Sequence, residues 1–229
     1  MIFLTSDPHR DFAYIKEFCH LNKTNKDDII FVTGDAQINY FLDDSDREIK
    51  KELNELPITF IFIQGNKEKR PNRISTYKTK NIYNADFYYE EEFPNQLYAK
   101  DGEVIILNNK KYLVMGGAYS VYAPGKEDGD FWWKDEQMSE ENRLNSLKTL
   151  QKHHYEVDYV LSHAAPYSKI PELGWIKDVD KNTLDLNFEK FLDEIDQKIK
   201  YKKWFIGHYH INHVDHKYNY VFKELVAID

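Results

Sequence analysis

The chain has 229 residues, of which 41% are apolar and 31% are charged, and it carries a net charge of −8 at neutral pH. This length suits one large domain with its own core, and no Pro-, Gly- or Ser-rich run is long enough to link two domains. The acidic balance disfavours binding to a nucleic-acid backbone, so duplex nucleic acid is not an expected partner.

The first third of the chain alternates apolar runs with helical patterns. Three nearly continuous apolar runs predict buried strands, at residues 2–5, 28–33 and 57–64. Two amphipathic patterns predict helices between them, at residues 11–21 and 43–56. One face of the first helix carries its larger apolar residues, Phe12, Ile15, Phe18 and Leu21. The β-α-β-α-β order predicts a layered α/β domain with mostly parallel strands.

The middle of the chain, residues 83–118, has a different pattern. Its short apolar runs are separated by Gly or Asn-Asn and predict hairpin-connected strands, at residues 96–99, 104–107 and 111–115. Ser139 is the expected N-cap of a helix that reaches about His153. The remaining patterns predict strands at 158–162 and 203–206, a helix at 186–199 and closing strands within 212–229.

The single cysteine and the start of the chain bear on where the protein works. Cys19 cannot form an internal disulfide, and its place in a helical pattern predicts a small core residue. The first residues lack the pattern of a signal peptide, and no apolar window approaches about 20 residues. We therefore expect a cytoplasmic protein that does not enter a membrane, and the sequence leaves its oligomeric state open.

Polar residues that can bind metal ions follow five of the predicted strands. In chain order they are Asp7 and His9, Asp35, Asn66, His163, and His208 with His210. Because ligands bind at the carboxyl ends of strands in layered α/β folds, we expect these side chains to converge. Carboxylate, amide and imidazole ligands without a thiolate suit Mn, Fe, Zn or Co. Seven ligands exceed the needs of one ion and suit two, an arrangement used to hydrolyse phosphate esters.

The order D-x-H, G-D, G-N, H, G-H-x-H resembles the calcineurin-like metallophosphoesterase superfamily, from Asp7 to His210. The resemblance implies an α/β fold, a four-layer αββα sandwich of two mixed β-sheets flanked by helices. In it, residues 1–229 form a single metallophosphoesterase domain, and the middle strands form the second sheet. It also implies two divalent ions, with Mn favoured and Fe, Zn, Ni or Co as alternatives. One ion would be held by Asp7, His9 and His210, the other by Asn66, His163 and His208, with Asp35 bridging the two.

The resemblance further implies hydrolysis of a phosphate ester by attack of a metal-bridging hydroxide. The family usually places a histidine after G-N, where this chain has Lys67. A lysine ammonium gives up its proton poorly at neutral pH, so Lys67 is expected to act as an electrostatic clamp on the phosphate. This substitution favours a phosphodiesterase acting on a small phosphoester or nucleotide. A phosphomonoesterase and a catalytically weak metal-binding interaction module remain alternatives.

Two further groups of residues are candidates for the surroundings of the phosphate. Arg10, together with His163, would add positive charge around it, since a guanidinium suits phosphate oxygens. Trp132 and Trp133 lie in the segment 124–137, which could form a lid that stacks on a flat group of the substrate. The alternative is that one of these tryptophans packs under the helix that follows Ser139. Glu68 is expected to cap or pair at the surface.

Overall fold

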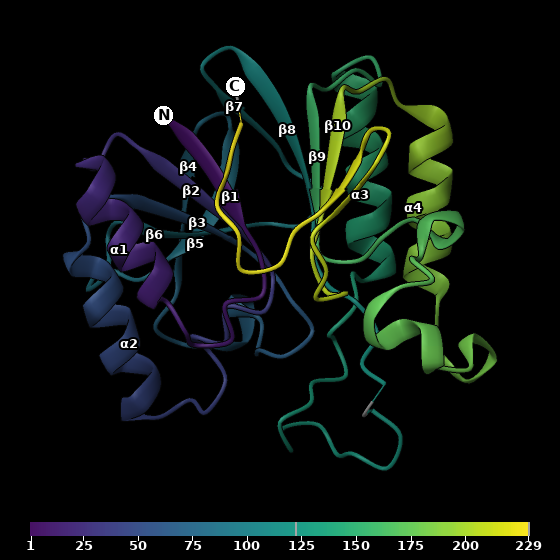
Figure 1. Ribbon diagram of the computed structural model, residues 1–229, viewed down its shortest axis with the longest axis horizontal. Helices are drawn as coiled ribbons and strands as arrows, with labels where there is room; N and C mark the ends of the chain where they lie inside the picture. Colours follow the sequence, from purple (N-terminus) through teal and green to yellow (C-terminus); the bar gives the residue numbers. More distant parts are fainter. Residues whose placement is uncertain (122, 229) are drawn as a thin grey trace.

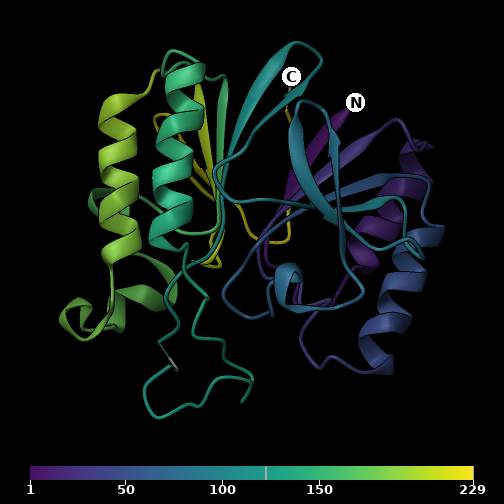
Figure 2. The same cartoon turned by 180° about the vertical axis from the view of Figure 1, so that it is seen from behind.

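Two β-sheets pack face to face in the computed structural model, which describes residues 1–121 and 123–228. Figure 1 shows helices on the outer face of each sheet, which gives four layers in the order α, β, β, α. The helices that cover the seven-stranded sheet are α1, Ala13–Asn22, and α2, Asp44–Glu55. The helices on the opposite outer face, seen from behind in Figure 2, are α3, Glu140–Lys152, and α4, Asn187–Lys198. The predicted sandwich of two mixed sheets is confirmed.

The first sheet has seven strands in the order β13-β1-β2-β3-β6-β5-β4. Its parallel centre is made of β1, Ile2–Thr5, β2, Ile29–Thr33, β3, Thr59–Ile63, and β6, Gln96–Ala99. Antiparallel strands complete its edges, namely β4, Lys78–Ile82, β5, Ala85–Tyr89, and β13, Val226–Ala227. The three strands predicted in the first third of the chain are therefore neighbours in one sheet.

The second sheet has six strands in the order β11-β12-β10-β9-β8-β7. Its parallel strands are β8, Lys110–Met115, β9, Tyr159–Ser162, β10, Lys203–Ile206, and β12, Tyr218–Tyr220. Its antiparallel edges are β7, Val104–Leu107, and β11, His213–Asp215. The predicted closing strands 212–229 are confirmed as β11 to β13, while residue 229 lies outside the described residues.

The expectation that all the middle strands form the second sheet is wrong. β4, β5 and β6 extend the first sheet from β3, and only β7 and β8 join the second. The reason is pairing: Phe60 to Phe62 of β3 pair in parallel with residues 96–98, and β5 then folds back on β6. The chain crosses between the sheets after β6.

Three apolar cores separate the four layers. The central core joins both sheets and includes Leu4 and Phe31 from the first and Val114 and Leu161 from the second, all fully buried. The outer cores lie between each sheet and its helices, and Cys19 is buried in one of them, as predicted. Leu21 departs from the expected helix face, because it is 69% exposed next to the end of α1 at Asn22.

Local sequence signals set the ends of the helices. The side chain of Asp43 accepts a hydrogen bond from the Ser45 amide, and the Ser139 hydroxyl accepts one from the Asn142 amide, so the predicted cap at Ser139 is confirmed. Short 3-10 turns that the sequence did not indicate occur at Pro71–Arg73, Tyr167–Lys169, Gly174–Asp178 and Lys181–Thr183. In the described residues, no helix has both the length and the apolar character required to cross a membrane.

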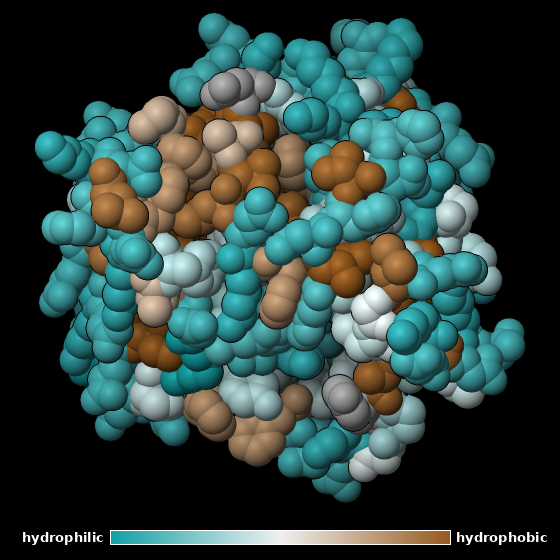
Figure 3. Space-filling view, viewed as in Figure 1, coloured by the Kyte–Doolittle hydropathy of each residue, from teal (hydrophilic) through white to brown (hydrophobic). Residues whose placement is uncertain are grey.

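The outer surface is dominated by polar side chains in the view of Figure 3, in keeping with the charged residues that make up 31% of the sequence. Several carboxylates are buried instead, and Glu189 is one of them. Glu189 on α4 is 2% exposed, and its Oε2 has no hydrogen-bond partner among the described residues. Burial raises the pKa of Glu189 to about 7, because the charged form is separated from water.

This carboxyl group makes the stability of the fold depend on pH. Its pKa is higher in the fold than in the unfolded chain, so its contribution to stability is complete below about pH 4.5 and is lost as the pH rises towards about 7. We expect Glu189→Gln to be more stable than the parent at about pH 8, by on the order of 1–3 kcal/mol, with a smaller difference at about pH 5.5. Urea unfolding at both pH values measures this difference. Glu194→Gln, on the exposed side of α4, is the control and should change the stability little at either pH; equal pH dependence of the parent and Glu189→Gln would contradict the prediction.

Candidate metal centre

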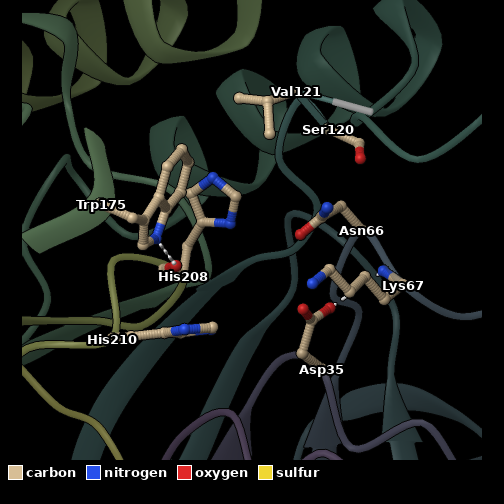
Figure 4. Close-up of a pocket in the computed structure, with 8 residues that line it drawn as sticks. All are labelled: Asp35, Asn66, Lys67, Ser120, Val121, Trp175, His208 and His210. Atoms are coloured by element: carbon tan, nitrogen blue, oxygen red, sulfur yellow. Dashed lines mark hydrogen bonds between the residues drawn. The ribbon is translucent and has the colours of Figure 1, made fainter. Parts of the chain in front are cut away.

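Seven metal-capable residues lie at the carboxyl ends of five parallel strands. Asp7 and His9 follow β1, Asp35 follows β2, Asn66 follows β3, His163 follows β9, and His208 and His210 follow β10. The first three strands belong to one sheet and the last two to the other. The side chains therefore meet where the ends of the two sheets come together, and Figure 4 shows several of them around one cavity.

A first group of ligand atoms comes from Asp7, His9 and His210, whose atoms all lie within 4.8 Å of one another. The Nε2 atoms of the two histidines are 2.9 Å apart. They lie 3.8 Å and 3.5 Å from Oδ1 of Asp7. That oxygen is buried and has no hydrogen-bond partner among the described residues. A buried carboxylate oxygen facing two imidazole nitrogens is the environment that a cation satisfies.

A second group comes from Asp7, Asp35 and His163, whose ligand atoms also lie within 4.8 Å of one another. Nδ1 of His163 is 2.8 Å from the carbonyl oxygen of Thr33, which can only accept, so Nδ1 carries the proton. Nε2, the other ring nitrogen, lies 3.5 Å from Oδ1 of Asp35 and 3.0 Å from Oδ1 of Asn66. Three ligand atoms that face one another in this way fit a second cation.

Protonation in the fold favours metal binding by these residues. Burial alone would raise the pKa of Asp7, but the neighbouring His163 and His210 hold it well below its usual range, so the group is a carboxylate. Burial lowers the pKa of His9 and lowers that of His208 well below its ordinary value, so both rings are neutral. Ligating groups must be deprotonated before they can bind a metal, and these three already are.

The glycine in each of two strand-end motifs leaves room for a ligand. Gly34 has a φ of +97°, and a Cβ there would lie 2.1 Å from Nδ1 of His163. A Cβ on Gly65 would lie 2.2 Å from Oδ1 of Asp35. Both distances are far below van der Waals contact, so a ligand side chain occupies the space that any other residue at these positions would fill.

The turns that carry the ligands are strained. Five of the seven candidate ligands have positive φ, namely Asp7 (53°), His9 (48°), Asp35 (49°), His208 (69°) and His210 (53°). Such conformations are unfavourable for residues other than glycine by about 1–3 kcal/mol each. Strain concentrated at one place in the fold indicates a functional site, because it persists only where the surroundings enforce it.

Asp7 and Asp35 differ in how many of the two groups of ligand atoms they belong to. Asp7 belongs to both groups, whereas Asp35 belongs to the second alone. The second oxygen of Asp7 accepts a hydrogen bond from the backbone amide of His208 at 2.8 Å, which links the first strand end to the last. Oδ1 of Asp35 accepts one from the amide of Lys67 at 2.9 Å. The bridging role expected for Asp35 stays a prediction.

Lys67 lines the cavity and points into it (Figure 4). Its charge contributes to the lowered pKa values of His9 and His208, after the larger effect of burial, so it acts on both sides of the site. Arg10 is directed elsewhere. Its guanidinium donates to the Gln37 carbonyl at 2.9 Å and to the Asp46 carboxylate, at the start of α2.

The two predicted tryptophans are not among the residues that line this cavity. Trp133 is 2% exposed and packs against Tyr40, with ring centroids 5.9 Å apart. Trp132 lines a different cavity, near α3 and α4. The cavity beside the candidate ligands is instead lined by three residues that the sequence did not indicate, namely Ser120, Val121 and Trp175. None follows a strand in a recognisable motif, so no sequence signal marked them.

Glu68 is buried, contrary to the expectation that it lies at the surface. It is 1% exposed, and its Oε2 accepts a hydrogen bond from the Tyr98 hydroxyl at 2.7 Å. Burial raises the pKa of Glu68 to about 8. The residue after Lys67 therefore anchors the turn in the core beneath the site.

Comparisons with known proteins agree with this geometry. A family model described as calcineurin-like phosphoesterase matches residues 1–212. Eleven chains of solved structures also match. One of these, a crystal structure, superposes with a TM-score of 0.52 over 96% of this chain and 88% of its own, at 11% sequence identity, which shows a shared fold alone. No curated protein sequence matches the chain.

Proposed function

Because this chain belongs to the calcineurin-like phosphoesterase family, we propose that it is a dinuclear metal-dependent hydrolase that cleaves a small phosphodiester. The family supports a metal-dependent phosphoesterase in general. The observation that carries the proposal is the convergence of two groups of ligand atoms that share Asp7. A protein that only bound a partner would have no need for these converging ligand atoms.

The residues suit two divalent cations. Asp7, His9 and His210 would hold one, Asn66, His163 and His208 the other, with Asp35 between them. When bound, the cations supply Lewis acidity, which activates a water as nucleophile and neutralises charge on the phosphate. The mixture of carboxylate, amide and imidazole without thiolate favours Mn, with Fe, Zn, Ni and Co as alternatives.

The protein itself would contribute position and charge. Lys67 places an ammonium group in the cavity beside the ligands, where it can donate hydrogen bonds to phosphate oxygens. The turn that carries Lys67 is fixed by the hydrogen bond from the Lys67 backbone N–H to the Asp35 carboxylate and by the buried side chain of Glu68. Because a lysine is a poor proton donor, the site suits a substrate whose leaving group departs with little protonation. This favours a diester over a monoester.

Two further proposals concern the whole chain. We propose that it acts as a single domain, since the central core takes residues from both sheets and the family model covers residues 1–212. We also propose a cytoplasmic location, because the only cysteine is buried and unpaired.

Turnover of two matched chromogenic substrates tests the proposed function. Bis(p-nitrophenyl) phosphate and p-nitrophenyl phosphate release the same phenolate and differ in being a diester and a monoester. We expect the Mn²⁺-loaded protein to hydrolyse the diester at least about 10-fold faster, judged by kcat/KM against Asp35→Asn as the blank. Faster turnover of the monoester would establish the phosphomonoesterase instead. Absence of turnover with both ions bound would favour the metal-binding module.

A further inference from the structure

The cavity beside the candidate ligands has two chemically different sides. Its volume is about 190 Å³. One side carries polar groups from Asp35, Asn66 and Lys67, while the opposite side carries Val121 and the indole of Trp175. Figure 4 shows the indole and the valine lying across the cavity from the lysine and the two oxygen ligands. A phosphate held at the polar side therefore faces an apolar wall.

Trp175 is held rigidly in this wall. Its indole Nε1 donates a hydrogen bond to the carbonyl oxygen of His208 at 3.1 Å. The ring stands perpendicular to the His208 imidazole, at an interplanar angle of 90°, and stacks on Tyr209 at 17°. The orientation of the wall is thus set before a substrate arrives, which reduces the entropy lost on binding.

The preceding residue explains how the 3-10 turn Gly174–Asp178 comes so close to the ligands. Gly174 has a φ of +66°, and a Cβ on it would lie 2.9 Å from Cγ2 of Ile211 and 3.0 Å from the carbonyl oxygen of Tyr209. Because residue 174 is a glycine, this turn can pack directly on Tyr209 and Ile211, which adjoin the two histidine ligands. Glycine at position 174 therefore lets Trp175 lie beside the candidate ligands while it also packs against the outer core.

We propose that Trp175 determines substrate specificity, by packing against a flat aromatic group on the ester oxygen that the product retains. This inference rests on the proposed phosphodiesterase function, because a monoester has no retained group. The cavity is smaller than the pockets of about 300–1,000 Å³ that hold drug-sized ligands, so it suits a phosphate with one ring. A charged or extended group would lose water at the apolar wall without gaining a partner.

A second role for Trp175 has to be separated from this one. Its hydrogen bond to the His208 carbonyl also supports a candidate metal ligand. If Trp175 only supported His208, Trp175→Ala would lower kcat/KM by the same factor for every substrate. A wall for the retained group instead affects only substrates that carry an aromatic group there.

The test compares two diesters with the same leaving group, bis(p-nitrophenyl) phosphate and methyl p-nitrophenyl phosphate. We expect the wild-type protein to prefer the first, and Trp175→Ala to reduce the ratio of the two kcat/KM values about 10-fold, mainly through KM. Trp175→Phe keeps a flat ring without the indole N–H and should retain most of the preference. Trp132→Ala removes the tryptophan that lines a different cavity and should leave the ratio unchanged.

Two results would overturn the inference. An equal loss for both diesters in Trp175→Ala would mean that the indole only supports His208. A ratio lost in Trp132→Ala and kept in Trp175→Ala would assign the aromatic contact to the segment 124–137.

Binding measurements separate this inference from the proposed function. Calorimetry with phenylphosphonate and methylphosphonate, on the Mn²⁺-loaded protein, reports the contact without turnover. Tighter binding of phenylphosphonate that disappears in Trp175→Ala supports the contact even if neither diester is hydrolysed, and in that case only the proposed activity fails. Diester turnover together with equal binding of the two phosphonates overturns the contact and leaves the activity standing.

Discussion

Asp35→Asn is expected to reduce the kcat/KM of the preferred phosphoester by about 10³-fold or more, because it removes a negative charge from the centre of the candidate site. Asp35 is 1% exposed, and its Oδ1 lies 3.5 Å from Nε2 of His163. The substituted amide keeps an oxygen that can accept the 2.9 Å hydrogen bond from the Lys67 amide. The variant should therefore fold normally, so that the loss reports on charge and metal binding.

Metal content measured by mass spectrometry, beside kcat/KM, shows which carboxylate is shared. If Asp35 bridges the ions, its replacement empties or weakens both sites. If Asp7 is the shared group, as its place in both groups of ligand atoms suggests, Asp7→Asn empties both and Asp35→Asn only one. Asp86→Asn, on β5 outside the site, is the matched control. Full activity and two bound ions in Asp35→Asn would contradict a metal-binding role for Asp35.

Lys67→Met is expected to lower the kcat/KM of the diester about 100-fold, since it removes the cation from the cavity and keeps most of the length of the side chain. The substitution leaves the hydrogen bond from the backbone N–H of residue 67 to the Asp35 carboxylate in place. Lys67→His restores the residue usual in the family and should raise monoester turnover relative to diester turnover, because imidazolium can donate a proton near neutral pH.

Lys69→Met is the control for Lys67, two residues further along the same turn. Lys69 is not among the residues that line the cavity, so the loss of its charge should change kcat/KM little. Similar losses in both variants would show that only the general positive charge of this turn matters. An unchanged rate in Lys67→Met would remove the clamp from the mechanism.

The parts of the fold that could be predicted are those with strong local signals. Buried parallel strands have continuous apolar sequences, and their polar ends place ligands at one edge, so the seven candidate ligands could be found from the sequence. The N-cap at Ser139 was equally local. In each case the residues that decide the structure are close together in the chain.

The features that were missed depend on contacts between distant segments. β4 has the sequence KTKNI and lies at a sheet edge, so it lacks the apolar pattern of a strand. Glu68 is buried because the Tyr98 hydroxyl, 30 residues away, reaches it. Trp175 reaches the cavity because Gly174 packs against the segment after His208. No periodicity within a short window contains this information.

The separation of the ligands along the chain bears on how the protein obtains its metal. His9 and His210 are 201 residues apart, yet their Nε2 atoms lie 2.9 Å from each other. During synthesis, the first ligands emerge from the ribosome long before the last, and neither group of ligand atoms is complete without β9 or β10. The first group can therefore bind a metal only after nearly the whole chain has been synthesised, whereas the second group needs the chain only as far as His163.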